Sequence, residues 1–159
     1  MKTKDTLLNL ATALIKKKSV TPKDDGALDV LKKKLQSIGF TNKDLPFGNK
    51  NKGDLVKNLY SLKVANSKSK RKNTLCFAGH TDVVPVGDIK EWRYNPFEGK
   101  IKNAKLHGRG ASDMKGAIAA WISACEKIID TQNIEINLYL LITGDEEGIA
   151  VNGTKKLVN

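Results

Sequence analysis

Hydrophobic residues recur at helical spacing in three segments of the chain. Residues 4–17 carry leucines and isoleucine every three or four positions, and residues 24–38 repeat this pattern before Gly39, which suits the end of a helix. Residues 114–129 place large apolar side chains on one face. We therefore predict three main helices and a further helix that begins at about Gly153.

Shorter apolar stretches between these helices are typical of strands. Residues 55–64 alternate between apolar and polar positions, residues 74–78 form an apolar run of the buried type, and residues 134–143 are the most strand-like segment. Residues 100–102 and 105–107 are predicted as two further short strands. Strands that alternate with helices predict an α/β fold, with a mixed β-sheet flanked by helices.

The basic composition changes this picture little. The formal net charge is +11, from 28 basic and 17 acidic side chains. The lysines of the two early helical segments fall on their polar sides. Residues 66–73 are predicted to form a solvated hairpin loop with no aromatic side chain for base stacking. We expect no nucleic-acid partner, although a nucleic-acid-binding module stays open as an alternative.

Two further features bear on the location of the protein. No apolar run approaches the ~20 residues that a membrane-spanning helix needs, and the first residues lack the continuous apolar stretch of a signal peptide. We expect a cytoplasmic protein without a membrane partner. Cys76 and Cys125 belong to no C-x-x-C pair, so they are predicted to be reduced and mostly buried.

Polar residues gather where the predicted strands end. His80 and Asp82 follow the buried run, Asp113 follows the two short strands, and Glu146 and Glu147 follow the last strand. Each feature alone is commonly structural, since an aspartate often caps a helix and acidic residues often precede one. In α/β sheets, however, ligands bind outside the carboxyl ends of strands. The glycine-flanked clusters together favour a metal site.

The residue types suit zinc, which binds imidazole nitrogen and carboxylate oxygen at about 2.0–2.2 Å. His80 offers the imidazole, and Asp82 can hydrogen-bond the other ring nitrogen. Asp113 can bridge two metals, because a carboxylate has two oxygens. The side chains of the adjacent Glu146 and Glu147 diverge, so one can bind metal while the other acts as general base.

The three clusters read Gly-His-Thr-Asp-Val-Val-Pro, Gly-Arg-Gly through Asp-Met-Lys-Gly, and Asp-Glu-Glu-Gly. They resemble the metal-site motifs of the aminoacylase and carboxypeptidase family of two-zinc hydrolases, and the likeness extends over essentially the whole chain. The resemblance implies that His80 binds one zinc, Asp113 bridges and Glu147 binds the other. It also implies that Asp82 orients His80 and that Glu146 is the general base and later the acid.

The resemblance implies two zinc ions, for which cobalt can substitute, and hydrolysis of a small-molecule N-acyl amino acid. It also implies a further carboxylate and histidine from later in the chain, and an inserted dimerisation domain. We therefore expect residues 1–159 to be a partial catalytic domain, inactive alone, from an enzyme that is a homodimer at full length. His107 stands where relatives usually carry an aromatic residue, so it is not expected to be a ligand.

The sequence leaves the substrate open. Acetylornithine deacetylases and aminoacylases of the same family are alternatives, because substrate choice depends largely on residues beyond this region. A non-catalytic metal-binding module is the alternative from a different class.

Overall fold

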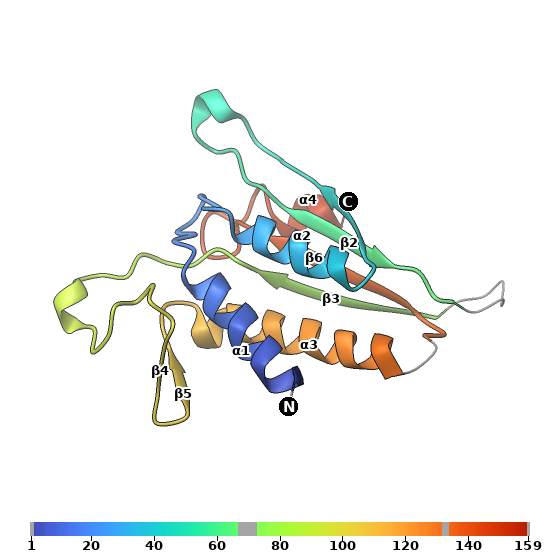
Figure 1. The fold of residues 1–159 in the computed structure, drawn as a ribbon. Coiled ribbons are helices and arrows are strands. Elements are labelled where there is room, and N and C mark those ends of the chain that lie inside the picture. The colour runs from blue at the N-terminus through green and yellow to red at the C-terminus, as the bar shows by residue number, and fades with distance from the viewer. Residues whose placement is uncertain (1, 67–72, 132–133, 159) are drawn as a thin grey trace.

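A computed structural model describes residues 2–66, 73–131 and 134–158 of the chain (Figure 1). Its main sheet has the order β1-β2-β6-β3. The strands are β1 (Thr41–Asp44), β2 (Leu59–Lys63), β6 (Asn137–Thr143) and β3 (Thr74–His80). β2 runs antiparallel to β1 and β6, whereas β3 runs parallel to β6. The predicted mixed sheet is confirmed.

Three helices share one core with the sheet. They are α1 (Lys2–Ile15), α2 (Ala27–Ser37) and α3 (Gly116–Thr131), close to the ranges predicted from periodicity. Leu14, Leu31 and Ile122 from these helices meet Leu140 and Ile142 of β6 in a single buried cluster. Burying such side chains supplies about 1.5–3 kcal/mol each, so this shared core fixes the helices on the sheet (Figure 1).

The ends of α2 show why the local sequence forms this helix. The carboxylate of Asp24 accepts the backbone N–H groups of Gly26 and Leu28, both at 2.9 Å, and thereby caps the first turn. Gly39 has a φ of 84°, and the N–H of Phe40 returns to the carbonyl of Leu35 at 3.0 Å. The predicted role of Gly39 at the helix end is confirmed.

β3 corrects two predictions. Among the described strands it pairs with β6 alone, so it lies at an edge of the sheet. Leu75 is 51% exposed and Cys76 is exposed, so the prediction of a buried strand and of a buried Cys76 is wrong. Cys125 is buried and both thiols are free, as predicted. β2 and β3 are not paired with each other, because β6 lies between them, and residues 67–72 of the predicted hairpin loop lie outside the described residues.

Other element boundaries also differ from the prediction. β1 was not predicted, and β2 covers only the second half of residues 55–64. β4 (Lys100–Lys102) and β5 (Lys105–His107) are strands as predicted, but they form a hairpin separate from the main sheet. The short helix α4 (Thr154–Leu157) follows Gly153 as predicted. No helix in the described part of the chain is long and apolar enough to cross a membrane.

Candidate metal centre

His80 is the last residue of β3, where the parallel register places it beside Thr143 at the end of β6. Its side chain is buried, with the whole residue only 4% exposed. The ring nitrogen Nδ1 lies 3.0 Å from the backbone carbonyl oxygen of Asp82, and Nε2 lies 3.0 Å from Oδ1 of Asp113. The imidazole is therefore fixed at one nitrogen and faces a carboxylate with the other.

Asp113 reaches this position from a turn rather than from a strand of the main sheet. The turn Ala111–Lys115 separates the β4–β5 hairpin from α3, which begins at Gly116 rather than at residue 114. Asp113 follows the two short strands as predicted, but these strands form a hairpin of their own and not part of the main sheet. The Asp113 side chain is 74% exposed and contacts His80, so its carboxylate is open to a ligand.

Asp82 organises the loop between β6 and α4, residues 144–153, which carries Glu146 and Glu147 and which we term the glutamate loop. It is 1% exposed, and its Oδ2 accepts the backbone N–H groups of Glu146 at 3.0 Å and Glu147 at 2.9 Å. Its Oδ1 lies 3.5 Å from Nδ1 of His80 and has no hydrogen-bond partner. The sequence suggested a contact with His80, but it did not reveal that Asp82 also fixes the glutamate loop.

The predicted ligands converge although they come from three distant segments. One donor atom each from His80, Asp113 and Glu147 can be chosen so that all three lie within 4.8 Å of one another. Glu146 lies beside this group, with Oε2 3.8 Å from Nε2 of His80 and its side chain 54% exposed. One imidazole and two carboxylates are a donor set that suits zinc.

The electrostatics of the cluster follow from its burial and charge. Burial alone would lower the pKa of His80, but the contacts with Asp82 and Asp113 outweigh it and raise the pKa to about 9. Burial and the nearby charges of Asp113, Glu146 and Asp82 raise the pKa of Glu147, against the opposing effect of His80. The cluster therefore gathers more negative charge than its own imidazole balances.

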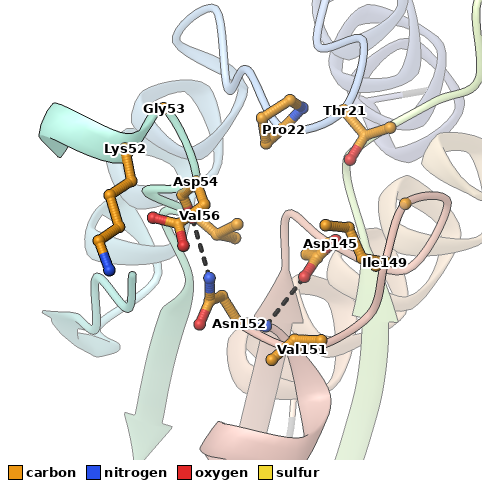
Figure 2. A pocket seen from close by; sticks show the side chains of 11 residues that line it. Thr21, Pro22, Lys52, Gly53, Asp54, Val56, Asp145, Ile149, Val151 and Asn152 are labelled. Atoms are coloured by element: carbon orange, nitrogen blue, oxygen red, sulfur yellow. Dashed lines mark hydrogen bonds between the residues drawn. The ribbon is translucent and has the colours of Figure 1, made fainter. Parts of the chain in front are cut away.

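Asp145 holds the second half of the glutamate loop through its buried carboxylate. Its carboxylate accepts the backbone N–H groups of Ala150 at 3.1 Å and Asn152 at 2.9 Å, and it is 4% exposed. It lines a cavity of about 600 Å³ together with Thr21 and Ile149 (Figure 2). Sequence reasoning gave Asp145 no role of its own, although the glycine and asparagine that follow it are typical of such a turn.

His107 does not join the cluster. Its ring packs edge-on against Tyr94, with the ring centroids 4.9 Å apart, in the β4–β5 hairpin. That His107 is not a ligand stays a prediction.

Curated relatives match almost the whole chain. The succinyl-diaminopimelate desuccinylase of Caulobacter sp. (strain K31) is 48% identical over 149 residues, which are 94% of this chain and 35% of the relative. The enzyme of the same name from Pelagibacter ubique (strain HTCC1062) is 47% identical over 153 residues, covering 96% of this chain and 38% of the relative. The chain thus spans little more than a third of the length of these relatives.

Solved structures agree with the fold. Human carnosine dipeptidase 1 superposes with a TM-score of 0.82 at 25% identity, over 97% of this chain and 34% of that one. The metallo-carboxypeptidase Sso-CP2 of Sulfolobus solfataricus gives a TM-score of 0.75 at 29% identity, over 89% of this chain and 31% of that one. The profile of peptidase family M20/M25/M40 matches residues 76–159, which include every predicted site residue. The chain therefore belongs to peptidase family M20/M25/M40.

Proposed function

We propose that the chain supplies the metal-binding part of a two-zinc amidohydrolase that cleaves N-succinyl-L,L-diaminopimelate to succinate and L,L-diaminopimelate. The convergence of His80, Asp113 and Glu147 within 4.8 Å carries the metallohydrolase assignment. The substrate is assigned from the curated relatives, which carry the desuccinylase name at 45–48% identity. Cobalt is proposed as a substitute for zinc, and the full-length enzyme as a homodimer.

In this proposal His80 and Glu147 would each hold one metal, and Asp113 would be shared between the two. Asp82 keeps His80 and the glutamate loop in place from the buried side, through the contacts of its carboxylate and its carbonyl. When bound, the metal pair supplies Lewis-acid polarisation of the amide carbonyl and lowers the pKa of the attacking water.

Glu146 is proposed as the proton carrier. Its carboxylate lies beside the donor cluster but is half exposed, so it can face a water and a substrate. It takes a proton from the attacking water as the new C–O bond forms at the amide carbon. It then returns that proton to the amide nitrogen as the C–N bond breaks, which releases succinate and the free amine.

A chimera tests this function without depending on the length of the present chain. The 149 matching residues of the Caulobacter sp. relative are replaced by those of this chain. We expect the chimera to hydrolyse N-succinyl-L,L-diaminopimelate, followed by loss of amide absorbance. A chimera that folds and binds metal but cleaves no amide would contradict the catalytic assignment. Preference for N-acetylornithine would favour the alternative deacylase.

Variants of the chimera separate the roles of the two glutamates. Glu146→Gln should abolish turnover and leave metal content nearly intact, because only proton transfer is removed. Glu147→Ala and His80→Ala should reduce metal content itself, measured by atomic absorption after dialysis. Loss of metal in the Glu146→Gln chimera would show that the roles are wrongly divided.

A further inference from the structure

Lys115 is a fully buried cation two residues from Asp113. It is 0% exposed, and its Nζ donates to the backbone carbonyl oxygen of Lys17 at 2.8 Å. In the described part of the chain no carboxylate lies within ion-pair distance of this ammonium group. Lysine is rarely buried in this way, because removing its charge from water is costly.

Two features of the surroundings offset this cost. Lys17 follows the last turn of α1, whose free carbonyl groups form the negative end of the helix. Burial lowers the pKa of Lys115 to about 8, and the second feature is the negative charge of Asp25, Asp24 and Asp82, which favours the ammonium form and offsets part of this effect. If packing alone mattered, an apolar side chain of the same length would fill the space without a charge. What the ammonium group provides beyond packing is its hydrogen bond to the Lys17 carbonyl.

The residues that follow Lys17 also hold the segment after His80. The hydroxyl of Ser19 donates to the carbonyl of Thr81 at 2.6 Å, and both groups are buried. The N–H of Val83 donates to the carbonyl of Ser19 at 2.9 Å. The N–H of Thr21 donates in turn to the carbonyl of Val83 at 3.2 Å. Residues 17–21, which we term the connecting segment, thus run along the residues that follow the first predicted ligand.

The connecting segment also touches the glutamate loop. A Cβ atom on Gly148 would lie 2.7 Å from Oγ1 of Thr21, so the backbone next to Glu147 packs directly against this threonine. Figure 2 shows Thr21 and Asp145 on the wall of the same cavity. One short segment therefore contacts all three ligand-bearing parts of the chain, and Lys115 is its bond to the part that carries Asp113.

We infer that Lys115 is a positioning residue for the metal centre, which acts by tethering the Asp113 turn to the connecting segment. The inference rests on the proposed metal site. Asp113 depends on such a tether, because its carboxylate is mostly exposed and, in the described residues, its hydrogen bond is to the His80 ring. The backbone of the turn, closed by the bond from Lys115 N–H to the Gly110 carbonyl at 2.9 Å, then sets the direction of that carboxylate.

The test is a cobalt titration of the chain, followed by the visible absorption of bound Co²⁺. Lys115→Met keeps an unbranched side chain that is one atom shorter and apolar, so it fills most of the space but cannot donate a hydrogen bond to the Lys17 carbonyl. We expect the cobalt Kd to rise about 10- to 100-fold, as for other residues that orient metal ligands. The d–d absorption bands should also change shape, because the Asp113 oxygen approaches the ion differently. Ser19→Ala, which loosens the connecting segment on its other side, should weaken binding in the same direction but less.

Leu35→Ala serves as the matched control for stability. This side chain is fully buried in α2, outside the ligand-bearing segments, and its truncation should cost about 2–5 kcal/mol without altering cobalt affinity. A Lys115→Met chain with the parent Kd and spectrum would overturn the inference, whatever its stability. If Lys115→Met does not fold by circular dichroism, an unchanged Kd and spectrum in Ser19→Ala would overturn it. A parent chain that binds no cobalt at millimolar concentration would instead refute the metal site itself.

Discussion

Replacing Asp82 by alanine should loosen the glutamate loop and destabilise the fold even without metal. One carboxylate oxygen accepts two backbone N–H groups, from Glu146 and Glu147, and the residue is buried. Hydrogen bonds to a charged group contribute about 1.5–3 kcal/mol each, so the two bonds together contribute roughly 3–6 kcal/mol. The other oxygen, Oδ1, is buried without a hydrogen-bond partner, which costs roughly 1–3 kcal/mol in the parent.

The net loss expected for Asp82→Ala is therefore about 2–3 kcal/mol, a large part of the 5–15 kcal/mol typical of a folded domain. Asp82→Asn retains an acceptor oxygen of the same shape but no charge. It should lose less than Asp82→Ala, since two neutral hydrogen bonds of about 0.5–1.5 kcal/mol each are retained. The difference between the parent and Asp82→Asn isolates the contribution of the charge, and the difference between the two variants gives that of the neutral acceptor.

The assay is urea unfolding at pH 7 with a chelator present, followed by tryptophan fluorescence and circular dichroism. Asp88→Ala is the matched control, because Asp88 also accepts a backbone N–H, from Lys90 at 2.9 Å, but at an exposed position. Its loss should stay near 1 kcal/mol or below. If Asp82→Ala unfolds within 1 kcal/mol of the parent, the glutamate loop is not held by this carboxylate and the reasoning fails.

Two other predictions concern metal binding by the chain. His80 must lose its proton to bind metal, so cobalt affinity in titrations should rise about tenfold per pH unit between pH 6.5 and 8.5 and level off above pH 9. Without metal the sign reverses: the raised pKa stabilises the fold fully below pH 6.5, and this contribution is lost as pH rises through about 9. A zinc ion normally needs four ligands, or three protein ligands and a water. In the described residues three donors converge for a site proposed to hold two ions, so the 159-residue chain should bind zinc weakly by calorimetry and hydrolyse no measurable substrate. A flat pH profile, or robust hydrolysis, would contradict the ligand assignment.

The helices were predictable because their signal is local. Apolar residues at helical spacing mark α1, α2 and α3, and Gly39 marks the end of α2 through its own backbone freedom. β1 carries no such signal, since its sequence Thr-Asn-Lys-Asp is polar and it is held by backbone pairing with β2. The exposure of β3 was unpredictable for a related reason: an apolar run does not reveal which strands lie beside it.

The site residues could be named from the sequence, but their supports could not. His80, Asp113 and Glu147 stand in motifs whose residue types suit zinc, and the fold brings them together. Asp82 lies 64 positions before Glu146, and Lys115 lies 98 positions after the residue whose carbonyl it binds. Neither bond follows from spacing or composition, because each depends on how distant segments pack.

The charge distribution argues that the cluster is built to receive a cation. The chain has 28 basic and 17 acidic side chains, yet the carboxylates of Asp82, Asp113, Glu146 and Glu147 gather around one imidazole. Burial and this crowding raise the pKa of Glu147, and the contacts with Asp82 and Asp113 outweigh burial and raise the pKa of His80 to about 9, so at neutral pH the imidazolium ring carries the positive charge within the cluster. A divalent cation would supply more positive charge and release that proton, while the bonds to Asp82 and Lys115 keep the ligand segments in place. The supports of the site are therefore separable from its ligands, and variants of each kind should differ in whether they lose stability or metal first.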